Sequence, residues 1–205
     1  MGKYGVMSDT PRWFSETEEG HSQWYIERFR KMARDGEDLA GEARMIDAIV
    51  APGSRILDAG CGPGRVGAEI HRRGHDVVGV DVDPELIAAA VEDHPGPTWL
   101  VADLATLDLA GVGHPQPFDA AVVAGNVMNF VARGTEAAVL RNLSSHVDKG
   151  GPIVIGFGLD RGYAIDQFDA DIASTDLIVD QRFATWDLRP FTVDSDFAVT
   201  ILRGS

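Results

Sequence analysis

The sequence predicts an α/β protein: a three-layer α/β/α sandwich built on a seven-stranded, mostly parallel sheet with a C-terminal antiparallel hairpin. Short apolar runs alternate with helical patterns over residues 54–158. Most of these runs are apolar throughout, as in strands that are buried on both faces. The last two strand patterns are separated only by residues 189–195, which is too short for a crossover helix, so we expect them to pair antiparallel.

Each element has its own local signal. Residues 1–20 are polar and predict a loose N-terminal arm. Apolar residues spaced three and four apart, with glycine or proline stops, predict helices over residues 22–35, 38–50, 64–74, 84–94, 134–147 and 162–174. Apolar or alternating runs between turn residues predict strands over residues 54–60, 76–82, 98–104, 117–125, 151–158, 177–188 and 196–203.

Length and charge limit the classes of function. A chain of 205 residues suits a single domain. Its net charge of −14 repels polyanions, so we expect neither a nucleic-acid nor an anionic membrane partner. The sequence contains no apolar stretch of membrane-spanning length and no signal-peptide pattern, and it has one cysteine, Cys61. The expected location is therefore the cytoplasm.

The first predicted strand runs into a glycine-rich loop, ILDAGCGPGRVG, at residues 56–67. Gly62, Gly64 and Gly67 match G-x-G-x-x-G, the pattern of a dinucleotide-binding turn. In an open parallel sheet the ligand lies beyond the carboxyl ends of the strands, so this loop should lie at the site whichever ligand binds. Asp81, at the end of the second strand, can accept hydrogen bonds from ribose hydroxyls and fits either interpretation.

Two other acids favour a ligand without phosphate. Asp58 stands directly before the glycines, where it would repel a pyrophosphate but suit an ammonium or sulfonium centre. Asp103 ends the third strand and can accept from an exocyclic amine such as that of adenine. A ligand with adenine, ribose and a cationic amino-acid tail is S-adenosylmethionine (SAM). An NAD-dependent Rossmann oxidoreductase and a non-catalytic SAM-binding module are the alternatives.

The chain resembles the class I SAM-dependent methyltransferases. The motifs that carry the resemblance are ILDAGCGPGR, VVGVDVDPELI, VADLATLDL and FDAAVVAGNVMNF, within residues 54–160. The resemblance implies a Rossmann-like sheet with the last strand inserted beside the fifth. It also implies one domain, residues 1–205, with an N-terminal arm and helical lid (1–50), a cofactor-binding core (54–160) and a C-terminal helix with antiparallel strands (161–205).

The resemblance also implies roles for individual residues at the methionine end. The backbone of residues 60–62 would line the methionine tail, and Asp58 would face its amino group. Residues 124–126 would border the methionine and the transferring methyl group. The cofactor-binding set predicted as a whole is Asp58, Ala59, Gly60, Cys61, Gly62, Gly64, Asp81, Val82, Asp103, Leu104, Ala124, Gly125 and Asn126.

At the other end of the cofactor, Asp81 would bind the ribose hydroxyls and Val82 would pack on the adenine. Asp103 would accept from the adenine amine, while the amide of Leu104 would donate to a ring nitrogen. The implied reaction is in-line transfer of the methyl group to a small-molecule acceptor, which leaves S-adenosylhomocysteine.

The acceptor end has weaker signals, and the sequence does not identify the acceptor, a catalytic residue or the oligomeric state. His21 and Tyr25, in the N-terminal segment, are the candidates for a base or an acceptor contact. Segment 159–175 carries aromatic and acidic residues and predicts a rim suited to a neutral or cationic small molecule. No cluster of His or acids has metal-ligand spacing, so we expect no metal.

Overall fold

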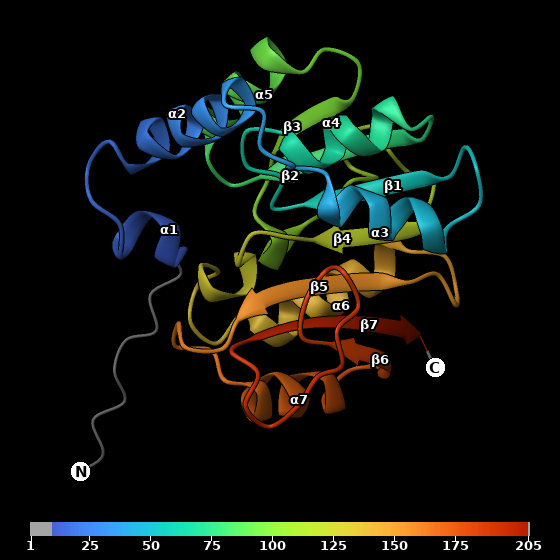
Figure 1. The fold of residues 1–205 in the computed structure, drawn as a ribbon. Coiled ribbons are helices and arrows are strands. Elements are labelled where there is room, and N and C mark those ends of the chain that lie inside the picture. The colour runs from blue at the N-terminus through green and yellow to red at the C-terminus, as the bar shows by residue number, and fades with distance from the viewer. Residues whose placement is uncertain (1–9, 205) are drawn as a thin grey trace.

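The computed structural model describes residues 10–204, which contain one seven-stranded sheet in the order β3-β2-β1-β4-β5-β7-β6 (Figure 1). Neighbouring strands from β3 to β5 in this order are parallel, and β7 runs antiparallel to both β5 and β6. The predicted fold class, with the last strand inserted beside the fifth, is confirmed. The strands are β1 Arg55–Ala59, β2 Asp76–Asp81, β3 Thr98–Val101, β4 Ala120–Val123, β5 Ile153–Gly158, β6 Leu177–Phe183 and β7 Phe197–Gly204.

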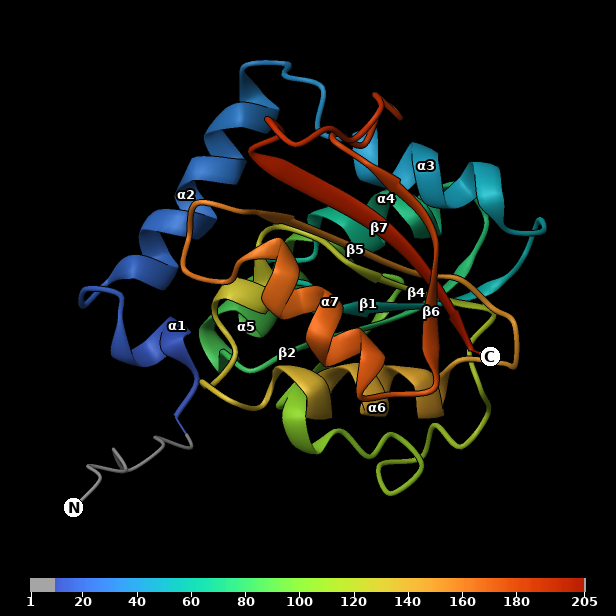
Figure 2. The same cartoon turned by 90° about the horizontal axis from the view of Figure 1, so that it is seen from below.

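Helices cover both faces of this sheet and one of its ends. The α-helices are α1 Arg12–Ser15, α2 His21–Arg34, α3 Gly41–Ile49, α4 Arg65–Arg72, α5 Pro84–Asp93, α6 Glu136–His146 and α7 Ile165–Ala173, and the 3₁₀ helices are η1 Leu104–Thr106 and η2 Val127–Asn129. Helices α3, α4 and α5 pack on one face. On the other face, α7 lies beside α6 and β6 (Figure 2). Among the described helices, none has the length and apolar character needed to cross a membrane.

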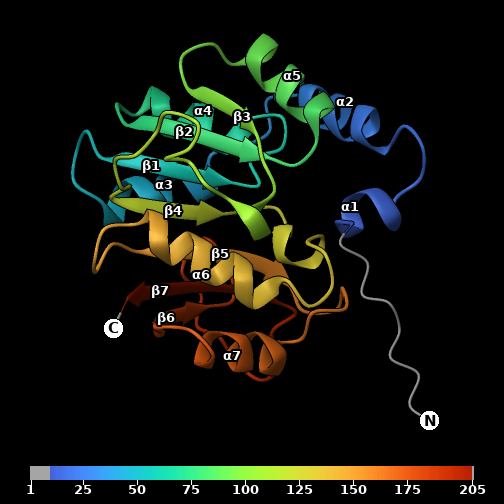
Figure 3. The same cartoon turned by 180° about the vertical axis from the view of Figure 1, so that it is seen from behind.

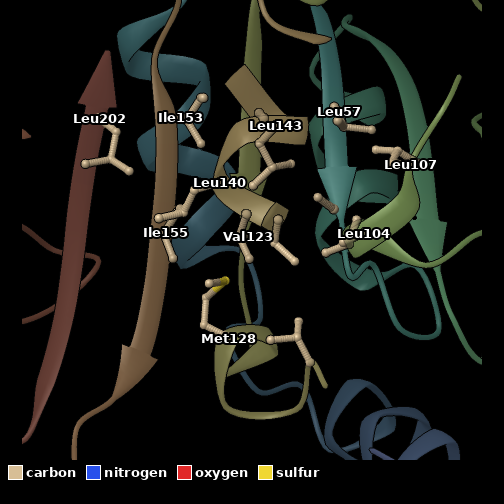
Figure 4. Close-up of a cluster of buried hydrophobic side chains, with 14 of the residues drawn as sticks. Leu57, Leu104, Leu107, Val123, Met128, Leu140, Leu143, Ile153, Ile155 and Leu202 are labelled. Atoms are coloured by element: carbon tan, nitrogen blue, oxygen red, sulfur yellow. The ribbon is translucent and has the colours of Figure 1, made fainter. Parts of the chain in front are cut away.

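Two apolar cores hold the layers together. Leu57, Val123 and Ile155, from three adjacent strands, pack against Leu140 and Leu143 of α6 (Figure 4). The opposite face of the same strands packs on α3 and α4. Burying each such side chain contributes about 1.5–3 kcal/mol, so these cores give the strand ends a fixed frame.

The structure corrects three local predictions. Residues 1–9 lie outside the described part of the chain, but residues 12–15 of the expected loose arm form α1, and the side chains of Arg12 and Trp13 are buried. The predicted alternation of strands and helices is interrupted between β3 and β4, whose connection contains only the short helix η1 and irregular chain. The predicted strand 177–188 ends at Phe183, because residues 184–189 turn back on themselves through a hydrogen bond from Ala184 N to Arg189 O.

Helices α1 and α2 lie beside the carboxyl ends of the parallel strands (Figures 1 and 3). Helix α2 packs on α5, where the Arg30 guanidinium donates to Asp93 at 2.8 and 3.0 Å. We call residues 11–34, which contain these two helices, the lid. The lid thus covers the edge of the sheet at which parallel folds bind their ligands.

Candidate active site

A pocket lies between the lid and the loops that follow β1, β2, β3 and β4. It is lined by Pro11, Trp13, Tyr25, Phe29, Asp58, Gly60, Cys61, Gly62, Pro63, Arg65, Val66, Asp81, Val82, Leu86, Ala102, Asp103, Leu104, Ala124, Gly125, Val127, Phe130 and Val131. We call the side formed by the glycine loop and the three acids, Asp58, Asp81 and Asp103, the floor of the pocket. The roof is the opposite side, formed by the aromatic rings of the lid together with Phe130 and Val131. Most of the floor was predicted from the sequence, whereas most of the roof was not.

The glycine loop after β1 makes a close turn against two other segments. The amides of Gly60 and Cys61 both donate to Val80 O, at 2.8 and 2.9 Å, which holds the loop against the end of β2. Gly60 has φ of 78°, and a Cβ there would lie 2.3 Å from the side chain of Val127. Glycine is therefore required at this position both by the left-handed backbone and by the contact with η2.

Asp81 is fixed by the backbone on either side of the pocket. Its Oδ2 accepts from Gly62 N at 2.8 Å and its Oδ1 accepts from Asp83 N at 3.0 Å. Burial raises the pKa of Asp81 to about 6, although these amide donors act in the opposite direction. Each carboxylate oxygen keeps acceptor capacity beyond its one amide, as a ligand diol would need.

Asp58 is the most deeply buried acid of the pocket, with 1% of its surface exposed. Its Oδ2 accepts from Gly67 N at 2.7 Å, and within residues 10–204 its Oδ1 has no hydrogen-bond partner. Burial raises the pKa of Asp58 to about 7, against the lowering effects of the Gly67 amide and the charge of Arg65. The ionised form is therefore costly in the free protein and would be stabilised by a ligand cation.

The far end of the pocket is formed by the start of η1. Asp103 caps this helix, because its Oδ1 accepts from Ala105 N at 2.8 Å. Leu104, the first residue of η1, also lines the pocket. Amides in the first turn of a helix have no acceptor within the helix. This end of the pocket therefore offers a carboxylate acceptor, Asp103, and the first amides of a helix. Val82 and Ala102 line the pocket beside them.

Aromatic side chains of the lid close the pocket from above. Trp13 lies edge-on to Tyr25 and Phe130, with ring centroids 5.5 and 5.4 Å away. The Tyr25 ring spans the mouth, since Cβ atoms built on Gly62 and Gly125 would lie 3.5 and 3.4 Å from Tyr25 Cε1 and Oη. Burial raises the pKa of Tyr25, so its hydroxyl keeps its proton near pH 7 and is able to donate a hydrogen bond to a ligand.

Arg65 supports the floor beside these rings. Its guanidinium donates to both carboxylate oxygens of Glu42, at 2.6 and 2.9 Å, and to Leu39 O at 2.6 Å. It also lies over the Phe29 ring, 5.1 Å from the centroid. The bidentate pair and the stacked ring fix this side chain, which brings a positive charge near Asp58 without depending on a ligand.

Besides the pair of Arg30 with Asp93, the part of the lid that carries α1 and the start of α2 is anchored to the core at two points. On one side, Asp83 Oδ2 accepts from Trp13 Nε1 at 2.7 Å and from the hydroxyl of Ser22. On the other side, the buried guanidinium of Arg12 donates to Val131 O at 2.9 Å and to Met128 O at 3.0 Å. Nothing in the local pattern of residues 11–22 predicts these contacts. The only sequence signal is an aromatic pair, Trp13 and Phe14, within a polar arm.

Comparison with known proteins identifies the family. A family model described as a methyltransferase domain matches residues 56–151. A crystal structure of a TehB-like SAM-dependent methyltransferase from Corynebacterium glutamicum is 39% identical, with a TM-score of 0.86, over 92% of this chain and 100% of that chain. The chain belongs to the class I SAM-dependent methyltransferases. The membership decides between the two interpretations of the glycine loop, in favour of SAM and against NAD.

Curated relatives of this methyltransferase match over shorter stretches. A magnesium-protoporphyrin O-methyltransferase from Rhodobacter capsulatus is 38% identical over 73 residues, which are 34% of this chain and 32% of that protein. An uncharacterised methyltransferase of Mycobacterium tuberculosis is 35% identical over 114 residues, 54% of each chain. The chain therefore spans about a third to a half of the length of these relatives. These partial matches do not indicate which acceptor this methyltransferase uses.

The methyltransferase pocket contains most, but not all, of the predicted cofactor set. Ala59 points into the buried core and does not line the pocket. Gly64 has a left-handed backbone at the start of α4 and faces Ala90 and Trp99. Asn126 also lies outside the lining, because its Oδ1 turns toward β5 and accepts from Gly158 N at 2.7 Å. These three positions shape the loops around the pocket.

Of the residues predicted to contact the acceptor, some line the pocket and others do not. Tyr25 lines the pocket, whereas His21 lies outside it and packs against Trp13, with centroids 4.9 Å apart. Segment 159–175 forms no part of the lining, so the predicted acidic, aromatic rim is wrong. Its Tyr163 is buried in the core and donates to Asp171 Oδ2 at 2.6 Å. The aromatic side of this segment faces the sheet because burying its rings there stabilises the fold.

The residues of the pocket fit SAM. Asp58 carries an oxygen that no group of residues 10–204 hydrogen-bonds, and its raised pKa marks a place where a positive charge is favourable. Asp81 retains acceptor capacity on both oxygens, and the wall beside it is apolar. Within residues 10–204, no group of three His, Cys, Asp or Glu side chains is arranged to hold a metal ion.

Proposed function

We propose that this methyltransferase transfers the methyl group of SAM to a small-molecule acceptor and releases S-adenosylhomocysteine. One observation carries the proposal. The lid adds Trp13 and Tyr25 to the lining of the pocket that holds the three acids, so that aromatic rings bound the space in which an acceptor would lie. A small molecule suits such a space.

The floor residues bind and orient the cofactor. Asp58 attracts the ammonium group of the methionine tail, and the glycine loop lets the backbone approach that tail closely. Asp81 accepts from the ribose hydroxyls, while Val82 packs on the adenine. Asp103 accepts from the adenine amine. When bound, SAM supplies an already activated methyl group on its sulfonium, and the protein supplies alignment, which contributes roughly 7–11 kcal/mol to such reactions.

The roof residues act on the acceptor. Trp13, Phe130 and Val131 give the pocket that Gly125 also lines an apolar wall. Tyr25 offers a neutral hydroxyl as a donor, since burial keeps its pKa high. The acceptor that best matches this wall has an apolar body and one polar group within reach of Tyr25. Tyr25 would position this group rather than remove a proton from it.

Two measurements test the proposal. Titration calorimetry should show binding of S-adenosylhomocysteine and none of NAD. Incubation with methyl-labelled SAM and a panel of small thiols, amines, phenols and carboxylic acids should then label at least one compound. Binding without turnover on any compound, or labelling only of macromolecules, would contradict the proposed acceptor class. A lack of S-adenosylhomocysteine binding would contradict the cofactor site itself.

A further inference from the structure

The carboxylate of Asp83 is buried, with 3% of its surface exposed, yet it does not line the pocket. Its Oδ1 accepts from Glu85 N at 2.8 Å and caps α5, as expected for an Asp before a helix. Its Oδ2 serves the lid instead, accepting from Trp13 and Ser22. We propose that Asp83 is a positioning residue that latches the lid over the pocket and controls the exchange of the cofactor.

The strength of this latch follows from its charge and burial. Hydrogen bonds to a buried carboxylate are roughly twice as strong as bonds between neutral groups. The N-terminus of α5 further favours a negative charge at Asp83. Trp13 contributes both the Nε1 donor of the bond to Asp83 and a ring that lines the pocket. The same side chain therefore holds the lid to Asp83 and covers the pocket.

The two anchors of the lid stand on opposite sides of the glycine loop. Asp83 follows β2, whereas the carbonyls that bind Arg12 belong to the segment after β4. Strands β2 and β4 are the two neighbours of β1 in the sheet. The lid therefore bridges the loop of β1, and release at Asp83 would let Trp13 and the start of α2 move away from the pocket, while Arg12 and Arg30 still hold the two ends of the lid.

The latch is also connected to the floor. The backbone amide of Asp83 donates to Oδ1 of Asp81 at 3.0 Å, and only Val82 separates the two acids. Movement of Asp83 therefore disturbs the carboxylate that we assign to the ribose. Lid opening and loss of the cofactor are coupled in this way. This inference rests on the proposed cofactor site, but the latch itself is present in the free protein.

The decisive variants are Trp13→Phe and Asp83→Asn. Phenylalanine keeps the aromatic packing and removes the Nε1 donor. Asparagine keeps an oxygen for the cap of α5 but turns an amide donor toward Trp13. Trp24→Phe is the matched control, because Trp24 belongs to the same lid and is 55% exposed.

Stopped-flow dissociation of S-adenosylhomocysteine should be about tenfold to a hundredfold faster in each latch variant, the range expected for losing a hydrogen bond to a charged group. The double variant should be no faster than Asp83→Asn alone, because that substitution already removes the bond to Trp13 together with the bond to Ser22. The control should match the wild type. Unchanged dissociation in Trp13→Phe, or additive effects in the double variant, would overturn the proposal.

A measurement on the free protein separates the latch from the proposed function. Hydrogen exchange at the amides of residues 13–24 should be accelerated about tenfold or more in both latch variants and remain unchanged in Trp24→Phe. Exchange in β1 and β4 should not change, which shows that the core is intact. Unaltered exchange in the lid would refute the latch even if the protein bound no S-adenosylhomocysteine.

Discussion

Replacing Asp58 with asparagine should have opposite effects on cofactor affinity and on the stability of the free protein. Asparagine has nearly the same shape and can still accept from Gly67 N. It cannot carry the negative charge that a bound ammonium or sulfonium needs. The wild-type carboxyl has a pKa of about 7, so its charge changes over a range of pH that is easily measured.

The magnitude for binding follows from the ionised fractions. A group with a pKa of about 7 is about 3% ionised near pH 5.5 and about 76% near pH 7.5, which strengthens cofactor binding roughly twentyfold or more over that interval. Asp81, with a pKa of about 6, adds a factor of roughly four. Wild-type affinity for SAM should thus rise about a hundredfold, whereas Asp58→Asn should retain only the fourfold rise of Asp81.

The effect of Asp58→Asn on the free energy of unfolding has the opposite sign to its effect on cofactor affinity. The folded-state pKa of Asp58 is raised from 3.8 to about 7, so between about pH 4 and pH 7 the folded protein holds a proton that the unfolded chain has released. The free energy of unfolding therefore falls as pH rises through this window. Asp58→Asn removes that loss and should stabilise the free protein near pH 8 by up to about 4 kcal/mol, at 1.36 kcal/mol per unit. Near pH 4 it should have little effect.

Calorimetric titration with SAM across this pH range and urea unfolding of the free protein test both effects. The reasoning is refuted if Asp58→Asn keeps the hundredfold pH dependence of affinity, or if the variant is less stable than the wild type near pH 8. A stabilising substitution that weakens binding would place Asp58 among residues retained for function at a cost in stability.

Three further substitutions test other parts of the site. Asp81→Ala should weaken SAM binding by about 1–3 kcal/mol in a calorimetric titration, and unchanged affinity would remove Asp81 from the site. Gly67→Ala should lower the free energy of unfolding by about 1–3 kcal/mol, because a Cβ there would lie 2.8 Å from a carboxylate oxygen and 2.9 Å from an indole carbon. Gly41→Ala is its control, with the nearest atom at 3.9 Å, and equal stability of the two variants would contradict the packing argument. Arg12→Lys should lower the free energy of unfolding by about 1–3 kcal/mol, because an ammonium cannot reproduce two guanidinium bonds to backbone carbonyls. An unchanged midpoint of thermal unfolding would show that this anchor contributes little.

The sheet and the floor of the site were predictable because their signals are local. Each strand is a short apolar run, and Asp58, Asp81 and Asp103 each stand where such a run ends. A parallel sheet gathers those ends at one edge, so position in sequence was enough to bring the three acids together. Each of these carboxylates is indeed part of the lining of one pocket.

Apart from Tyr25, the roof was not predictable, because its contacts join distant parts of the chain. Trp13 bonds to a residue 70 positions away, and Arg12 to one 119 positions away. Asn126 shows a different limit: its left-handed backbone, with φ of 67°, turns the side chain toward β5, and residue type alone does not reveal this angle. In segment 159–175 the composition indicated aromatic side chains but not which way they face.

The long-range anchors of the lid also have a consequence for how the protein folds. Contacts of high sequence separation form late, because a long stretch of chain must be ordered before they gain anything. The lid cannot dock until the segment carrying Met128 and Val131 is in place, so the sheet should fold first and the roof last. Residues 11–22, which are synthesised before the sheet, would thus reach their native positions after it, and the binding site would become complete only in the final step of folding.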